Sequence, residues 1–319
     1  MAKISACIVA YCDYDEVCTA VRSILAHTPG PDFRLYVVDN ASPDGCGEKL
    51  AGTPFGDSRV EVVRLPHNDG FGSGHNSVLD RLDSDVHFIL NPDVVLEDDI
   101  LDGMADWLMN HPAVVMATPQ LHFPDGRIQH LPRRKPRITA MAVRQFPALV
   151  EKVGFFRRIN ERYTMQDEDL TRPQPIEFCT GSFMAVRTDV FRKVGGFDRD
   201  YFMYVEDADL TQRVLCYGKV YLLPQFTAIH AWHRDPVRDK RKFWMQVRSM
   251  VLFFKKWGFG SSHVPNNPRQ GPFFCVTVIP ADRRLTECGG FDHRGGRPLC
   301  KSRPSGLHTS RWVYAALLF

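Results

Sequence analysis

The sequence lacks an apolar run that could cross a membrane as a helix. No stretch approaches the roughly 20 apolar residues that span a bilayer. The first residues lead directly into an expected strand, without the pattern of a signal peptide. From these two absences we expect a cytoplasmic protein without a membrane span.

Paired cysteines and an excess of one charge are also missing. None of the nine cysteines stands in a CxxC pair or at zinc-site spacing, which favours a reducing compartment over a disulfide framework. The chain has 40 Lys and Arg against 37 Asp and Glu, and a net charge of +3 does not indicate nucleic-acid binding. What remains is an ordinary globular composition, 44% hydrophobic over 319 residues, enough for one large domain or two.

Short apolar runs alternate with helical patterns in the first half of the chain. We expect strands at 4–10, 34–39, 60–65, 86–90 and 113–118, and helices near 15–27, 73–82 and 98–110. This alternation predicts an α/β fold with a mainly parallel, doubly wound sheet. Residues 124–175 are rich in Pro, Arg and acids, and we expect long loops there with at most one helix.

A second ordered block follows, from 176 to about 260. We expect strands at 176–186 and near 219–230, and helices at 188–194, 206–218 and 240–257. Residues 261–319 are rich in Arg, Gly and Pro, and are interpreted either as a poorly ordered tail or as a frameshifted read-through that is dispensable for chemistry. The predicted parts are therefore 1–95, 96–260 and 261–319.

Two acidic sites stand where the chain is expected to reverse. Glu206, Asp207 and Asp209 open a helix directly after an apolar segment, and helix capping explains one of these acids but not three. Asp93 follows an apolar strand, where ligands of α/β sheets usually bind, although Asn91-Pro92 also favours a simple turn. Together the two sites suggest a metal and a general base in one cleft.

Three other features each allow two interpretations. Asp39 ends a strand and suits either a ribose hydroxyl or an Asx turn. The glycine-rich loop at 67–76 could approach a diphosphate or could only form a tight turn. His230 or His233 could complete a metal site with Asp93 or could have a surface role.

In their order and spacing these motifs resemble the family 2 glycosyltransferases, most closely the bacterial rhamnosyltransferase-like branch that builds O-antigen and capsular glycans. The matching segments are residues 8–11, 38–42, 68–72, 90–93, 180–182, 194–198 and 202–210, together with His230. The resemblance covers roughly residues 3–258, and it implies a GT-A fold. That fold joins a nucleotide-binding half to an acceptor half.

The resemblance also implies roles for individual residues. Asp207 stands at the position of the catalytic base, with Glu206 beside it, and Asp93 and His230 stand at positions that bind Mg²⁺ or Mn²⁺. The implied donor-binding residues are Tyr11, Asp39, Asn40, Asn68, Gly70, Phe71, Asn91 and Asp93. Those implied on the acceptor side are Gly181, Ser182 and Asp209.

The activity implied is inverting, metal-dependent sugar transfer. The donor would be a dTDP- or UDP-linked sugar, with dTDP-rhamnose as the best candidate, and the acceptor a hydroxyl of a lipid-linked glycan. The basic, aromatic helix at 240–257 is expected either to pack on the core or to lie on anionic lipid. In the second case this helix and the basic loop 133–137 would contact the inner face of the cytoplasmic membrane. The alternatives are a catalytically degenerate sugar-nucleotide binder and an NAD-dependent oxidoreductase, whose glycine fingerprint after the first strand is missing.

Overall fold

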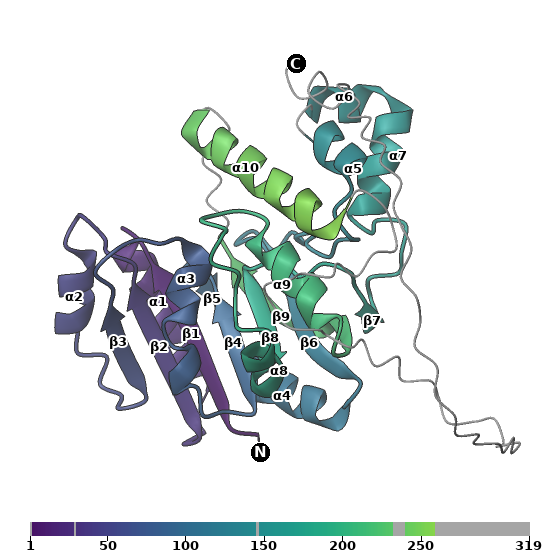
Figure 1. Cartoon of the computed structure of the whole chain (residues 1–319). Coiled ribbons are helices and arrows are strands. Elements are labelled where there is room, and N and C mark those ends of the chain that lie inside the picture. Colours follow the sequence, from purple (N-terminus) through teal and green to yellow (C-terminus); the bar gives the residue numbers. More distant parts are fainter. Residues whose placement is uncertain (1, 29, 145–146, 232–239, 259–319) are drawn as a thin grey trace, which may run out of the picture. The chain divides into compact units, whose positions relative to one another are not determined.

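A nine-stranded mixed sheet forms the centre of the structure, a computed structural model that describes residues 2–28, 30–144, 147–231 and 240–258 (Figure 1). Its strands run in the order β3-β2-β1-β4-β8-β6-β9-β5, and β7 pairs with β9 at the side. The strands are β1 (Ile4–Ala10), β2 (Phe33–Asp39), β3 (Val60–Arg64), β4 (Val86–Leu90), β5 (Val94–Val95), β6 (Val114–His122), β7 (Gln174–Pro175), β8 (Phe183–Arg187) and β9 (Lys219–His230).

Helices cover both faces of this sheet (Figure 1). The helices of the described residues are α1 (Tyr14–Ala26), α2 (Cys46–Gly52), α3 (Phe71–Asn76), α4 (Ile100–Asn110), α5 (Ile138–Val143), α6 (Pro147–Lys152), α7 (Gly154–Tyr163), α8 (Thr188–Lys193), α9 (Glu206–Val214) and α10 (Lys240–Trp257), with a short 3-10 turn at Leu79–Arg81. Of these, α5 to α7 and α10 lie away from the faces of the sheet (Figure 1). Side chains of β1 alternate between the two core layers: Ile8 packs with α1, α2 and α4, and Val9 with α8 and α9. This period of two buries β1 on both faces.

The direction of the strands places several loops at one edge of the sheet. β1 lies between β2 and β4 and is parallel to both, so the carboxyl ends of these three strands meet. β8 then enters between β4 and β6 and is antiparallel to both. The expected doubly wound, mainly parallel sheet is therefore confirmed, with antiparallel strands in its second half.

Helix α10 packs against the segment that precedes and begins α9. Its buried residues Phe253, Phe254 and Trp257 form a separate apolar cluster with Tyr201 and Ala208. The core-packing interpretation of this helix is thus correct for its carboxyl-terminal half.

The boundaries differ from the sequence-based expectations at several elements. Residues 138–163 form three helices, α5 to α7, where loops with at most one helix were expected. The strand expected at 176–186 is reduced to β8, and the helix expected at 73–82 is α3 followed by a 3-10 turn. The short strands expected near 219–230 are one strand, β9, whose pairing with β6 jumps from Leu223 to Thr227. Pro224 lies in this irregular stretch, as is common for a residue that has no N–H to donate to a ladder.

The interpretation of the tail at 261–319 lies outside the described residues. Its proposed dispensability therefore stays a prediction, as does the division of the chain at residue 95.

Candidate active site

The carboxyl edge of the parallel strands brings the predicted donor-side residues together. In the sheet register Ala10 pairs with Asp39 and Ile8 with Leu90, so Tyr11, Asp39 and Asn91 lie at neighbouring strand ends. The Tyr11 side chain is 49% exposed and presents its ring to solvent. Asp39 is buried, and its carboxylate accepts long hydrogen bonds from the Ser42 N–H at 3.4 Å, the geometry of a turn.

Asn40 ties the end of β2 to the glycine-rich loop. Its Nδ2 donates to Asn68 Oδ1 at 2.9 Å and to the carbonyl of Gly70 at 3.2 Å. The Asn40 Oδ1 atom is buried without a hydrogen-bond partner among the described residues. A buried acceptor of this kind is costly unless a ligand donates to it, which is compatible with the predicted donor-binding role.

The glycine loop turns tightly at Gly70 and contacts the segment before α9 there. Gly70 has φ +97°, and a Cβ atom there would lie 2.0 Å from the carbonyl oxygen of Phe202. The Phe71 N–H donates to that same oxygen at 3.1 Å, so it is not available to a phosphate. The positive φ angle of Gly70 agrees with the tight-turn interpretation, while the predicted donor-binding role of Gly70 and Phe71 stays a prediction.

The predicted metal ligands lie side by side. β5 pairs with β9 so that Val94 stands opposite His230, and this brings Asp93 Oδ1 to 3.2 Å from His230 Nε2. Asn91 Nδ2 lies 3.3 Å from the same nitrogen. His233 lies outside the described residues.

Gln129, which the sequence did not single out, fixes the tautomer of His230. Its Nε2 donates to the carbonyls of His230 at 2.6 Å and His122 at 3.4 Å, so its Oε1 faces His230 Nδ1 at 2.9 Å. An amide oxygen only accepts, so Nδ1 carries a proton and Nε2 is the ring nitrogen that faces Asn91 and Asp93. Such a hydrogen bond to the far nitrogen is typical of metal-binding histidines.

This donor set fits Mg²⁺ or Mn²⁺ only in part. Among the residues that the structure describes, no group of three or more His, Cys, Asp and Glu side chains could hold a metal ion. Asp93 and His230 provide one carboxylate oxygen and one imidazole nitrogen that face each other. Mg²⁺ is commonly bound by one or two carboxylates together with substrate phosphates, and the pair suits an ion completed by a diphosphate.

The predicted base lies at the start of α9. Tyr204 and Val205 both have left-handed φ angles, +70° and +67°, before the helix begins at Glu206. A β-branched residue in this region is strained, and such strain gathers at functional sites. Asp207 accepts hydrogen bonds from the N–H groups of Gly181 at 3.0 Å and Ala208 at 2.8 Å, which fix the direction of its carboxylate.

Burial raises the pKa values of both carboxyl groups at this helix start. Burial is the main cause for Asp207, and it is opposed by the N–H groups of Gly181 and Ala208 and by the charge of Arg133. Glu206 is 7% exposed, and both its burial and the neighbouring charge of Asp207 raise its pKa. Since one buried charge disfavours the other, Glu206 is the acid that holds its proton and Asp207 the one that ionises first.

The 180–182 loop connects the two acidic sites. The Asn91 N–H donates to the carbonyl of Ser182 at 3.0 Å, and the next residue back, Gly181, donates its N–H to Asp207. The predicted acceptor-side residues Gly181 and Ser182 therefore join the Asn91 end of β4 to the base through their backbones.

Asp209 is a correction to the predicted acceptor side. Its side chain is 0% exposed and accepts from Arg213 Nε at 2.8 Å, Lys256 Nζ at 2.7 Å and Trp257 Nε1 at 2.8 Å. A carboxylate that is fully enclosed and saturated in this way cannot bind an acceptor. It holds α10 against α9 instead.

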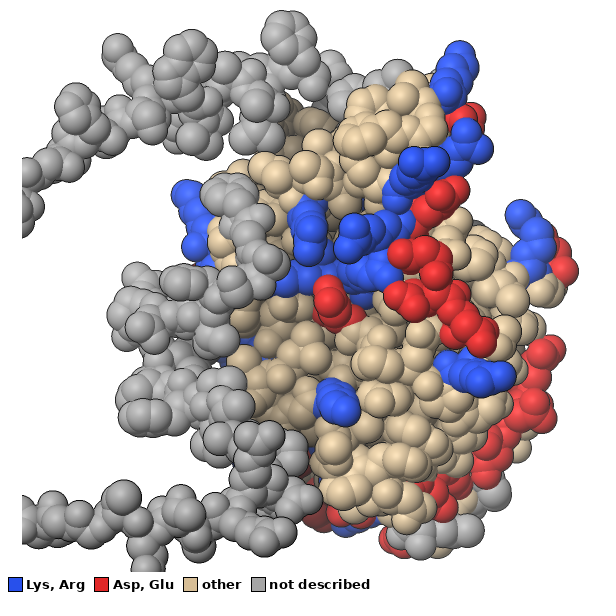
Figure 2. Space-filling model, turned by 90° about the vertical axis from the view of Figure 1, so that its right-hand side faces the viewer, with Lys and Arg blue, Asp and Glu red and all other residues tan. Residues whose placement is uncertain are grey.

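The basic loop 133–137 is largely engaged within the protein. Arg133 is buried and donates to the Pro132 carbonyl at 3.0 Å, and Arg134 pairs with Asp167 at 2.9 Å and with Glu168. On the face that carries α5 to α7, basic and acidic side chains lie next to one another (Figure 2). The expected membrane role of this loop is therefore not supported for Arg133 and Arg134, and Arg133 acts on Asp207 instead.

Comparison with known proteins agrees with this geometry. The profile described as Glycosyl transferase family 2 matches residues 5–195. The chain is 30% identical over 175 residues, 52% of its length, to the rhamnosyltransferase WbbL of Escherichia coli K12, of which the match covers 62%. It is 27% identical over 201 residues, 56% of its length, to an N-acetylglucosaminyl-diphospho-decaprenol L-rhamnosyltransferase of Mycobacterium tuberculosis, of which 60% is covered. The chain thus matches about three fifths of these relatives.

Solved structures share the fold at low sequence identity. A mannosyltransferase from Pyrobaculum calidifontis, in complex with GDP-Man and Mn²⁺, superposes with a TM-score of 0.54 at 14% identity, over 82% of this chain and 65% of that one. GalNAc-T7 with UDP, GalNAc and Mn²⁺ superposes with a TM-score of 0.59 at 13% identity, over 81% of this chain and 49% of that one. These likenesses establish a GT-A fold. Because the family profile matches more than half of this chain, the chain belongs to glycosyl transferase family 2.

Proposed function

We propose that this chain transfers a sugar, with inversion, from a nucleoside diphosphate sugar to an acceptor hydroxyl. The observation that carries the proposal is the 180–182 loop, which ties Asn91 at the metal side to Asp207 at the base side within one hydrogen-bonded segment. This reaction needs a general base and a site for a metal ion. Asp207, whose carboxylate is held in one direction, suits the first role, and Asp93 beside His230 suits the second.

In the proposed reaction Asp207 accepts the proton of the acceptor hydroxyl as its oxygen attacks the anomeric carbon. The carboxylate must be ionised, and the N–H groups of Gly181 and Ala208 hold it in one direction. Asp93 and His230 would hold a Mg²⁺ or Mn²⁺ ion, which when bound supplies positive charge for the departing diphosphate. The unpartnered Oδ1 of Asn40 is positioned to accept a hydrogen bond from the donor.

The relatives suggest the substrates. Both have rhamnosyltransferase in their names, so dTDP-rhamnose is the proposed donor, with UDP sugars next. The mycobacterial name specifies a lipid-linked diphospho-sugar, so the proposed acceptor is a lipid-linked glycan of O-antigen or capsule synthesis.

Contact with the inner face of the cytoplasmic membrane is part of the proposal. It rests on α10, where Trp244 is 59% exposed and Phe243 is also exposed near the basic amino-terminal end of the helix. Within the described part of the chain, no helix is both long enough and apolar enough to cross a bilayer.

A two-stage experiment tests the function. Thermal shifts with dTDP-rhamnose, UDP and GDP sugars in Mn²⁺ identify the donor, and transfer is then measured for Asp207→Asn. We expect transfer to fall by roughly 10²–10⁴-fold because only the proton acceptor is lost, with the donor-induced shift unchanged. Asp80→Asn, the same change at an exposed site, should leave both quantities unchanged.

Three outcomes would contradict the proposal or a part of it. Donor binding without turnover in the wild-type protein would favour the degenerate binder. Near wild-type transfer by Asp207→Asn would exclude Asp207 as the base. No shift with any nucleotide sugar would remove the donor assignment itself.

A further inference from the structure

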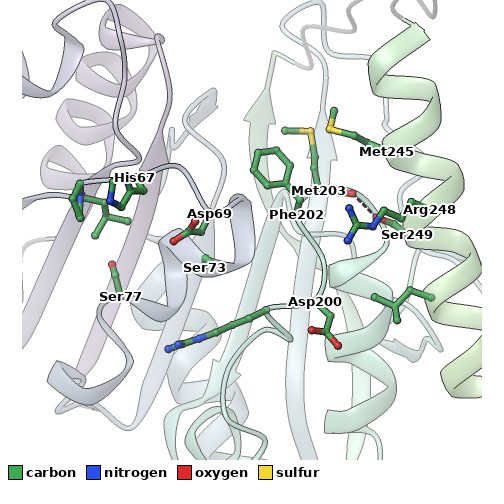
Figure 3. A pocket seen from close by; sticks show the side chains of 14 residues that line it. His67, Asp69, Ser73, Ser77, Asp200, Phe202, Met203, Met245, Arg248 and Ser249 are labelled. Carbon is green, nitrogen blue, oxygen red and sulfur yellow. Dashed lines mark hydrogen bonds between the residues drawn. The ribbon is translucent and has the colours of Figure 1, made fainter.

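A cavity of about 770 Å³ lies beside the site already described, between the loop after β3, the segment before α9, and α10 (Figure 3). Its size falls within the roughly 300–1,000 Å³ of typical ligand pockets. None of the predicted donor, metal or base residues lines it. Its walls come from both halves of the fold, with Asp69 and Ser73 on one side and Arg248 of α10 on the other.

The charged side chains of this cavity are balanced. Arg199 and Arg248 line it together with Asp69 and Asp200. Within the described residues, no ion pair or side-chain hydrogen bond engages any of these four charged groups. Two guanidinium groups alone would favour a phosphate, but the two carboxylates beside them cancel that preference.

Apart from the imidazole of His67, the remaining lining is made of hydroxyl groups and apolar surface. Three serines, at positions 73, 77 and 249, line the cavity, and so do the exposed ring of Phe202 and the side chain of Met245. A sugar residue matches this combination, because its hydroxyl groups both donate and accept hydrogen bonds while its C–H faces are apolar. Carboxylates accept, guanidinium groups donate, and an aromatic ring covers a C–H face.

The cavity wall continues directly into the predicted base. Phe202 and Met203 line the cavity and precede Asp207 by five and four residues. Both of their carbonyl groups accept hydrogen bonds. The Phe202 carbonyl accepts from the Phe71 N–H at 3.1 Å, and the Met203 carbonyl accepts from Ser249 Oγ of α10 at 2.8 Å. A ligand in the cavity therefore touches the segment whose two left-handed residues set the position of the base.

We propose that this cavity binds a sugar residue of the acceptor glycan, recognised by Arg248 and Asp69 from opposite walls. The inference rests on the proposed function, since it assigns the acceptor part of the same reaction. It also gives α10 a second role as one wall of the acceptor site.

The test uses the full chain loaded with dTDP and Mn²⁺. Saturation-transfer NMR is recorded with methyl glycosides of N-acetylglucosamine, galactose, mannose and rhamnose. We expect a signal from at least one glycoside and its loss in Ser73→Trp, which fills the cavity. The matched control, Ser58→Trp, makes the same change at an exposed turn outside the cavity and should keep the signal.

A second, smaller substitution tests the inference in case Ser73→Trp does not fold. Arg248→Gln, exposed on α10, should weaken glycoside binding by about tenfold, the loss of one charged hydrogen bond, and should leave the dTDP-induced thermal shift unchanged. Absence of any glycoside signal, or a signal that persists in Ser73→Trp, would overturn the inference. Because dTDP binding is measured separately, its failure would instead count against the proposed function.

Discussion

The junction between α10 and the catalytic helix allows a test whose magnitude follows from its bonds. Trp257 is 6% exposed, and its Nε1 donates to the fully buried Asp209 at 2.8 Å. Trp257→Phe keeps most of the ring and removes this one donor. A hydrogen bond to a charged group contributes about 1.5–3 kcal/mol, so the free energy of unfolding should fall by that amount. Lys256 and Arg213 still pair with Asp209, which prevents a larger loss.

Thermal unfolding followed by circular dichroism measures the effect. For a domain of this size each kcal/mol lowers the melting temperature by about 2–4 °C, so Trp257→Phe should lower it by roughly 3–12 °C. Trp244→Phe makes the same change on the same helix at a side chain that is 59% exposed, and should change stability by less than about 0.5 kcal/mol. Equal melting temperatures for the two variants would refute the reasoning that α10 is held by its contact with Asp209.

Four further predictions concern the base, the metal side and the glycine loop. Burial raises the pKa of Asp207, so kcat/KM should fall as pH drops through a value above the usual 3.9 or so of aspartate, and a limb at the usual value would count against a buried base. Because the pKa of Asp207 is raised, ionising this carboxyl lowers the stability of the fold as pH rises through that pKa. The melting temperature of Asp207→Asn relative to wild type should therefore be higher at pH 8 than at pH 4. Gln129→Leu should weaken Mn²⁺ affinity in the presence of dTDP by about 10–100-fold, and unchanged affinity would exclude its role in orienting the histidine. Gly70→Ala, whose Cβ would meet a carbonyl oxygen at 2.0 Å, should destabilise far more than Gly56→Ala, which has φ +71° and open space; equal losses would show that only φ matters.

Much of the fold follows from local pattern. The strand at 4–10 was predictable because apolar residues continue without interruption, as expected for a strand buried on both faces. The helices at 138–163 were not, because they are short and lie in a segment rich in Pro and charge. Short helices gain most of their stability from packing rather than from sequence preference.

The candidate site also has residues that the sequence indicated and residues that it did not. Sequence pattern and family resemblance together singled out Asp93, Asp207 and His230, and the structure brings Asp93 next to His230. Gln129 and Arg133 carried no signal, because a glutamine behind a histidine and an arginine in a basic loop look ordinary until their partners are known.

The sequence by itself determined the alternation of strands and helices in the first half of the chain, the positions of the two acidic sites and the family. The tertiary structure alone decided which acids are available. Asp207 and Asp209 lie on one turn of α9, yet one keeps a directed carboxylate beside Gly181 and the other is enclosed by α10. The physical reason is that a carboxylate's role depends on the cations and N–H groups that meet it, and here these come from residues 26 and 48 positions away.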